Sequence, residues 1–413
     1  MCRLLFAPRY GNGFAAAPVF LQRSAGPLDA SAASLHLWVM KFIHTADWQI
    51  GKPFKNFGDK ESVLRQARLA AIETIGQLAK REGVAHVLVA GDLYDTESPA
   101  MKTMLEPLER MRQSPGVSWH IIPGNHDPHR GQGLWDRLLA HGLPANVLPH
   151  LTPEPVMIGT EAVLLPAPMR RKSEVNDLTQ WMDEAASPAG VIRLGLAHGS
   201  ITGFDSGGEA NNPIAPDRAR RAGLDYLALG DWHRTLQAGP ATWYAGTPEA
   251  DRFNSQERGQ ILLVDIPAAR APVSVVPLTT GAYQWQSATL TVTSAEDFDA
   301  AESRLRSRPD LSVLLLRLDI KGALPLAARA ELEQRLTRLE AALFWLETDV
   351  SGLLVRPTLE DFERIDFQGV LREVAETLKA MAEDEGQNAF VRRRAEEALV
   401  QMFLMSQQSG STA

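Results

Sequence analysis

The sequence predicts an α/β fold in which two packed sheets carry helices on their outer faces. From Met40 to about Leu278, short apolar runs alternate with amphipathic segments, and the later runs are bounded by proline and glycine. Five polar segments each follow directly after an apolar run. Ligands of open α/β sheets bind at the carboxyl ends of strands, so we expect the five segments to converge on one crevice.

The predicted strands before these segments are Lys41–Thr45, Ala85–Ala90, Trp119–Ile122, Val191–Ala197 and Asp225–Leu229. The polar segments share acidic, amide and imidazole side chains, and in chain order they are Asp47-Trp48-Gln49, Gly91-Asp92-Leu93-Tyr94-Asp95, Gly124-Asn125-His126-Asp127, His198, and Gly230-Asp231-Trp232-His233.

The outer helices are predicted from apolar residues at helical spacing. Glu61–Glu82 is the clearest, and Met101–Arg112 and Gly133–His141 are shorter. Gln260–Ile266 and Val273–Pro277 are typical of antiparallel strands.

After Thr280 the pattern restarts as a small α/β unit followed by two helices. The strands and helices expected there are Tyr283–Val292, Ala295–Arg306, Leu311–Ile320, Ala327–Ala342, Phe344–Val350, Phe367–Glu383 and Asn388–Met405. We therefore predict a catalytic domain over residues 40–280, an α/β cap domain over 281–350 and a C-terminal helical region over 351–413. Residues 1–39 show neither helical nor strand periodicity, and we interpret them as a disordered extension or a mis-assigned start.

Composition excludes several classes of protein. A single cysteine, Cys2, rules out a disulfide framework or a thiolate zinc site and fits a reducing cytoplasm. No segment approaches the roughly 20 apolar residues of a membrane span. The net charge of −8 lies mainly in the tail: residues 281–413 hold 22 acidic and 15 basic side chains. This balance argues against a broad basic surface for nucleic acid, although bound cations would reverse the charge locally.

Aspartate, asparagine and histidine are the ligands expected for two adjacent divalent cations such as Mn²⁺, with Mg²⁺ as the alternative. A bridging carboxylate can hold two such ions about 3.5–4 Å apart, which places a hydroxide for in-line attack on phosphorus.

The order of these segments resembles the calcineurin-like metallophosphoesterases, whose pattern is D-x-H, G-D, G-N-H-D, a lone His and G-H-x-H. His44-Thr45-Ala46-Asp47-Trp48, Gly91-Asp92-Leu93-Tyr94-Asp95 and Tyr244-Ala245-Gly246-Thr247-Pro248 resemble, more narrowly, the SbcD-type DNA repair exonucleases. The resemblance covers Met40 to about Leu278 and implies a metallophosphoesterase-like two-sheet sandwich.

The resemblance also implies roles for individual residues. Asp92 would bridge the two cations, and His126 would donate a proton or hydrogen bond to the leaving oxygen, with Asp127 orienting its imidazole. The remaining first-metal ligands would be Asp47, Gln49 and His233, and the remaining second-metal ligands would be Asn125, His198 and Asp231.

Two residues depart from the family pattern, because Gln49 and Asp231 stand where the family has histidine. A glutamine oxygen ligates hard cations but is neutral, and the extra carboxylate makes the cluster more anionic. Both changes keep an oxygen donor, so we expect Mn²⁺- or Mg²⁺-dependent catalysis to be retained.

The leading hypothesis is a DNA exonuclease of DNA repair. The chain has no G-x-x-x-x-G-K-[ST] phosphate loop, so ATP dependence would come from a separate SbcC-type ATPase. The two C-terminal helices would either dock on this ATPase or pack on their own domain. A homodimer is implied by the resemblance alone.

Several basic and aromatic residues are candidates for DNA contacts, with solvated faces or ordinary packing as the alternatives. They are Lys52, Lys55, Arg170, Arg171, Lys172, Arg218, Arg220, Arg221, Trp48 and Trp232.

Two other functions remain open. One is a phosphatase or cyclic-nucleotide phosphodiesterase, although a small substrate needs no additional lobe. The other is a DNA-binding scaffold in which Gln49 and Asp231 mark lost catalysis.

Overall fold

The computed structural model describes residues 5–6, 40–203, 212–253, 258–355 and 370–409. The chain divides into two compact units, and the larger comprises Ala16–Asp251 and Glu257–Gln284. The smaller comprises Met1–Ala15, Arg252–Gln256 and Trp285–Ala413. In the described part of the chain, no helix combines the length and the apolar character that a membrane span requires.

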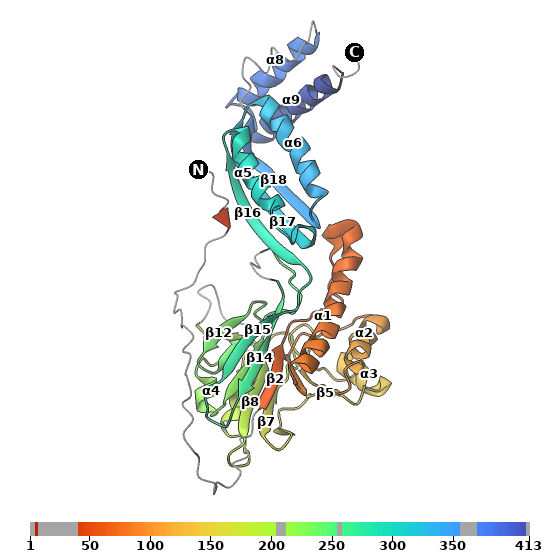
Figure 1. Cartoon of the computed structure of the whole chain (residues 1–413), viewed down its shortest axis with the longest axis vertical. Helices are drawn as coiled ribbons and strands as arrows, with labels where there is room; N and C mark the ends of the chain where they lie inside the picture. Colours follow the sequence, from red (N-terminus) through yellow and green to blue (C-terminus); the bar gives the residue numbers. More distant parts are fainter. Residues whose placement is uncertain (1–4, 7–39, 204–211, 254–257, 356–369, 410–413) are drawn as a thin grey trace, which may run out of the picture. The chain divides into compact units, whose positions relative to one another are not determined.

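The larger unit contains two six-stranded sheets (Figure 1). In the first sheet β2 to β5 are parallel, and β14 pairs antiparallel with both β2 and β15. In sheet order its strands are β15 (Ser274–Thr279), β14 (Gln260–Ile266), β2 (Met40–Thr45), β3 (His86–Ala90), β4 (Ser118–Ile122) and β5 (Val147–Pro149).

The second sheet is parallel in its centre and has an antiparallel strand at each edge. In sheet order its strands are β12 (Leu236–Gly239), β13 (Thr242–Tyr244), β11 (Tyr226–Gly230), β8 (Ile192–His198), β7 (Ala162–Ala167) and β6 (Val156–Ile158). The short parallel pair β9 (Ser200–Ile201) and β10 (Pro213–Ile214) lies outside both sheets.

Alternate residues of the strands face two different cores, as period-two side-chain alternation requires. Phe42 and Leu88 lie in the core shared by the two sheets, whereas Ile43 and Val87 pack against the helices. The helices on that face are α1 (Glu61–Arg81), α2 (Met101–Arg112) and α3 (Leu134–His141). The second sheet has its own outer core, near the short helix α4 (Arg218–Arg221). The 3₁₀ helices η1 (Lys55–Lys60) and η2 (Gln180–Asp183) complete the described elements of this unit.

The smaller unit is built on a sheet whose strand order is β1-β16-β17-β18, with β17 and β18 parallel. A separate cluster packs Leu326 of α6 against Ala375 of α8 and Leu399 of α9. The elements are β1 (Leu5–Phe6), β16 (Gln284–Val292), α5 (Ala295–Arg306), η3 (Leu311–Val313), β17 (Leu314–Leu324), α6 (Leu326–Glu340), β18 (Trp345–Val355), α8 (Val370–Glu383) and α9 (Ala389–Ser409).

The α/β class and the two-sheet sandwich are confirmed. The predicted helix Met101–Arg112 matches α2, and Glu61–Glu82 ends one residue beyond α1. The sequence did not predict β5, β6, β7, β12 and β13, and all of these except β7 have only three or four residues, too few to show periodicity. Leu5–Phe6 of the predicted extension pair with β16, and the other residues of 1–39 lie outside the described residues.

Candidate metal centre

Backbone hydrogen bonds between loops bring the first two polar segments together. The Asp47 N–H donates to the Gly91 carbonyl at 3.2 Å, and the Gln49 N–H donates to the Asp92 carbonyl at 2.9 Å. Asp47, Gln49 and Asp92 have φ values of 56°, 42° and 55°, and Asp231 has 98°. Positive φ is uncommon for residues other than glycine and tends to occur at functional sites. Four of the seven expected metal ligands are therefore held in unusual backbone conformations.

Glycines at the strand ends make room for the functional side chains. A Cβ on Gly91 would lie 2.4 Å from Nδ1 of His198, and a Cβ on Gly124 would lie 2.2 Å from Oδ1 of Asp92. A Cβ on Gly230 would lie 2.0 Å from the backbone oxygen of Ala90. These contacts are too close for any other residue, which explains why glycine precedes the polar residues in three of the segments.

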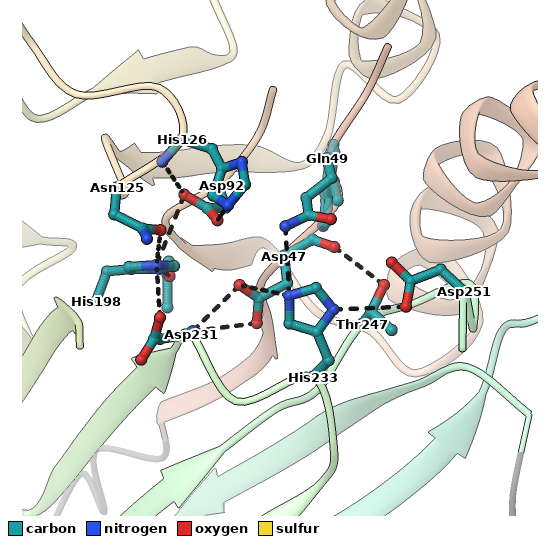
Figure 2. A network of polar contacts seen from close by, with 12 residues as sticks. Asp47, Gln49, Asp92, Asn125, His126, His198, Asp231, His233, Thr247 and Asp251 are labelled. Carbon is teal, nitrogen blue, oxygen red and sulfur yellow. Dashed lines mark hydrogen bonds and ion pairs between the residues drawn. The ribbon is translucent and has the colours of Figure 1, made fainter. Parts of the chain in front are cut away.

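Asp47, Asp92 and His198 form the centre of the site. Each offers a ligand atom within 4.8 Å of the others, and all three side chains are buried. Nε2 of His198 lies 3.6 Å from Oδ1 of Asp92 and 3.8 Å from Oδ1 of Asp231 (Figure 2). Two buried carboxylates beside an imidazole form a suitable donor set for a divalent cation. The chain's own residues therefore fit a metal here.

The partners of His198 prepare its imidazole to bind a cation. Nδ1 lies 2.8 Å from the backbone oxygen of Ala90, to which it donates, so Nε2 faces the carboxylates. Burial alone would lower the pKa of His198, but Asp92, Asp47 and Asp231 together raise it to about 9. A proton on Nε2 thus occupies the position that a cation would take.

Asp47 and Asp231 each accept a hydrogen bond from another part of the chain. The Asp231 N–H lies 3.1 and 3.2 Å from the two carboxylate oxygens of Asp47. The Ser200 hydroxyl donates to Oδ2 of Asp231 at 2.6 Å, which leaves Oδ1 facing His198. Burial raises the pKa of Asp47 to about 6, against the lowering effect of His233 and His198.

Asn125 and His126 belong to the same network of polar contacts (Figure 2). Oδ1 of Asn125 lies 3.0 Å from Nε2 of His198. The backbone N–H of His126 donates to Oδ1 of Asp92 at 2.9 Å, and Nδ1 of its ring lies 3.0 Å from the backbone oxygen of Asp95. Nε2 of His126 is 4.0 Å from Oδ2 of Asp92, so this ring nitrogen faces the centre.

The expected role of Asp127 is wrong in one respect. Its carboxylate accepts hydrogen bonds from the N–H groups of Gly124 at 2.7 Å and Tyr94 at 3.0 Å. It therefore joins the loops after β3 and β4, whereas the Asp95 carbonyl orients the ring of His126. Burial, with a smaller contribution from Asp92, raises the pKa of Asp127 to about 7.

Gln49 and His233 lie on the other side of Asp47. Nε2 of His233 is 4.0 Å from Oδ1 of Asp47 and 3.3 Å from the amide nitrogen of Gln49. Nδ1 of His233 faces Oδ1 of Asp251 at 3.5 Å. All seven expected ligands thus lie in one network of polar contacts (Figure 2).

Three charged residues that sequence reasoning assigned no role in the site support this side of it. Asp251 is buried and accepts hydrogen bonds from Lys52 at 2.5 Å and Arg68 at 2.8 Å. Burial alone would raise the pKa of Asp251, but Arg68, His233 and Lys52 hold it well below its usual range. Arg68 also donates to the Trp48 carbonyl at 2.6 Å, which ties α1 to the first polar segment. No local motif marks these residues, because Arg68 and Asp251 are 183 positions apart.

Several candidate DNA contacts have other partners. Lys52 is bound to Asp251, and Arg218 is buried in ion pairs with Asp177 and Asp183. Trp48 is buried and packs edge-on against Trp119, so it is not available to stack on a base. The candidates that the structure leaves exposed are Lys55, Arg170, Arg171, Lys172, Arg220 and Arg221.

This donor set is one that a metal-dependent hydrolase could use. Residues 40–235 match the calcineurin-like phosphoesterase family, and this part of the chain is a calcineurin-like metallophosphoesterase domain. The chain is 27% identical over 313 residues to an uncharacterized metallophosphoesterase, YhaO, of Bacillus subtilis, covering 69% of this chain and 72% of that protein.

Two relatives carry the names of a nuclease subunit and of a DNA repair protein. One is the SbcD component of the nuclease SbcCD of Rhodobacter capsulatus, 25% identical over 400 residues, covering 83% of this chain and 94% of that protein. The other is the DNA double-strand break repair protein Mre11 of Methanosarcina acetivorans, 22% identical over 361 residues. That match covers 84% of this chain and 56% of the relative's length.

Proposed function

We propose that this protein is a metal-dependent DNA nuclease, acting as an exonuclease in DNA repair in the cytoplasm. The observation that carries the proposal is the buried group of Asp47, Asp92 and His198 with His126 beside it. The names of the Rhodobacter and Methanosarcina relatives support DNA as the substrate. The smaller unit also supports it, because a small phosphoester needs no additional lobe.

The residues assigned to the two cations are those expected from the sequence. Asp47, Asp92 and His233 would hold the first, beside Gln49, and Asp92, Asn125, His198 and Asp231 would hold the second. Two divalent cations, Mn²⁺ or Mg²⁺, would activate water for in-line attack on the scissile phosphorus.

His126 supplies the proton for the leaving group. With Nδ1 donating to the Asp95 carbonyl, the protonated ring can deliver the proton on Nε2 to the leaving oxygen. Asp127 acts indirectly, by holding the loop that carries Asn125 and His126. A rigid loop matters because a displacement of about 1 Å can cost a hundredfold in rate.

The deciding experiment is Mn²⁺-dependent digestion of labelled linear duplex and single-stranded DNA by the full chain. Asp92→Ala and His126→Ala should abolish or strongly reduce cleavage, whereas His141→Ala, at the exposed end of α3, should not. If DNA stays intact while a phosphomonoester or a cyclic nucleotide is hydrolysed, the protein is a phosphatase or phosphodiesterase instead.

A catalytically weakened scaffold is the second candidate, and the departures at Gln49 and Asp231 favour it. Restoring both histidines (Gln49→His with Asp231→His) distinguishes the two. A large gain in activity supports the scaffold, and an unchanged or lower activity supports the enzyme.

An SbcC-type ATPase is the proposed partner, with homodimerisation as in the resembled family. Apolar residues of the two C-terminal helices divide into two groups. Ala395 and Leu399 are buried, whereas Leu371 and Val374 of α8 are exposed. The exposed group supports docking on α8, and Leu371→Asp should weaken co-purification with a co-expressed ATPase subunit while leaving DNA cleavage by the isolated chain unchanged.

A further inference from the structure

The side chain of Gln49 is oriented by a lysine. Nζ of Lys52 lies 3.0 Å from Oε1 of Gln49, and the amide nitrogen of Gln49 lies 3.3 Å from Nε2 of His233. An ammonium group has only donors, so the Gln49 atom that faces Lys52 must be its carbonyl oxygen. The opposite amide orientation would place two donors against each other. The amide NH₂ of Gln49 therefore faces His233.

His233 fits this arrangement. Its Nδ1 faces the carboxylate of Asp251 at 3.5 Å, which favours the tautomer with a proton on Nδ1 and a lone pair on Nε2. That lone pair accepts the hydrogen bond from the Gln49 amide, and a cation bound to Nε2 of His233 would displace this bond. Arg68 and Lys52 both donate hydrogen bonds to Asp251. Lys52, Gln49, His233 and Asp251 therefore form a ring of contacts in which each donor faces an acceptor (Figure 2 shows Gln49, His233 and Asp251).

We infer that Gln49 is a hydrogen-bond donor into the centre and not a metal ligand, because Lys52 holds its carbonyl oxygen. The first cation position then has three protein ligands, Asp47, Asp92 and His233. The second keeps four, Asp92, Asn125, His198 and Asp231. The two positions are thus unequal, and the second fills first.

The lysine reinforces this inequality through its charge. Its ammonium lies on the side of the first position, bound to both Gln49 and Asp251, and its side chain is only 22% exposed. A half-buried positive charge opposes a divalent cation nearby more strongly than a solvated one does. Rotation of the Gln49 amide to offer its oxygen would also place its NH₂ against the ammonium.

The inference deepens the proposed function and depends on its metal dependence, not on DNA as the substrate. Its test is calorimetric titration of Mn²⁺ into the full chain, with bound Mn²⁺ counted by electron paramagnetic resonance. The variants are Gln49→Ala, Lys52→Met and the double variant, and Lys55→Met is the control because it removes an exposed lysine nearby. Lys52→Gln removes the same charge should Lys52→Met fold poorly.

The expected result is two classes of Mn²⁺ site of unequal affinity. Gln49→Ala should change neither affinity by more than about twofold, because Gln49 contacts the same nitrogen of His233 that would bind the cation and so does not support that ligand. Loss of a true ligand should cost at least about tenfold. In the presence of Gln49, Lys52→Met should raise the Mn²⁺ affinity of the weaker class about tenfold, because the freed amide can offer its oxygen. In the Gln49→Ala background, the same change should raise that affinity only about two- to threefold. Lys55→Met should have no effect.

Two results would overturn the inference: a loss of tenfold or more in Gln49→Ala, or an equal effect of Lys52→Met in both backgrounds. A wild-type chain without Mn²⁺ binding would overturn the inference and the metal dependence together. Unequal classes with the expected variants but intact DNA would overturn only the nuclease assignment.

Discussion

Three histidines form a ladder across the first sheet, away from the metal centre. Nδ1 of His86 lies 3.2 Å from Nε2 of His120, and Nδ1 of His120 lies 3.0 Å from Nε2 of His150. The rings of His120 and His150 are nearly parallel, with 4° between their planes. The side chain of His120 is buried, and burial, assisted by His150 and His86, lowers its pKa to about 3.

This ladder predicts a loss of stability in acid. Because the pKa of His120 is about 3 in the folded protein and about 6.5 when unfolded, the unfolded state binds more protons between those values. Stability is therefore retained above about pH 6.5 and falls as the pH drops toward 3. The linkage relation gives about 2 kcal/mol lost between pH 7.5 and 5.0 from this one residue. A neighbouring effect is expected from His150, whose pKa burial lowers to about 4.

The assay is urea unfolding followed by tryptophan fluorescence at both pH values, with His120→Gln compared with the wild type. The variant cannot protonate at this position, so its free energy of unfolding should fall by about 2 kcal/mol less than that of the wild type. His141→Gln, which removes an exposed histidine, should behave as the wild type does. Parallel losses in the wild type and His120→Gln would refute the reasoning.

Three further predictions concern the site and the DNA surface. EDTA should abolish hydrolysis and lower the melting temperature, and added Mn²⁺ should restore both, because ions that bind only the folded state stabilise it; a melting temperature insensitive to EDTA would contradict this. Gly124→Ala should lower the Mn²⁺ affinity at least about tenfold, because the added Cβ would lie 2.2 Å from Oδ1 of Asp92. Unchanged titration curves would show that this glycine is not needed to make room for the carboxylate. Replacing Arg170 and Arg171 by alanine should reduce the slope of log binding constant against log salt concentration by about two, as measured by filter binding of DNA across salt concentrations. Arg218→Met, which removes buried ion pairs, should lower the melting temperature without changing that slope.

Much of the fold follows from local patterns. The apolar runs before Asp47, Asp92 and Asn125 end where β2, β3 and β4 end, and the run before Asp231 ends one residue before the end of β11, so the polar residues lie at strand ends as expected. Strand and helix periodicity depends on neighbouring residues, which the sequence displays directly. The glycines were visible for the same reason, although only the structure shows that Gly124 makes room for Asp92.

Side-chain partners could not be read from local patterns. No local pattern around His86 or His150 indicates a partner, yet both contact His120. Their proximity depends on the pairing of β3, β4 and β5, which places residues about 30 positions apart on one face of the sheet. Lys52 was expected among the residues that face DNA. Its partner Asp251 is 199 positions away, so no local pattern indicates their contact.

The sequence by itself determined which residue types lie close together. They are the carboxylates, amides and imidazoles that follow consecutive buried strands, because the loops after parallel strands lie at the same edge of a sheet. Only the tertiary structure decided how each donor is used. It placed the Asp127 carboxylate on the N–H groups of Gly124 and Tyr94, and it turned the oxygen of Gln49 toward Lys52. The physical reason is that a buried polar atom binds whatever complementary partner lies within about 3 Å, and sheet register and helix packing alone select that partner.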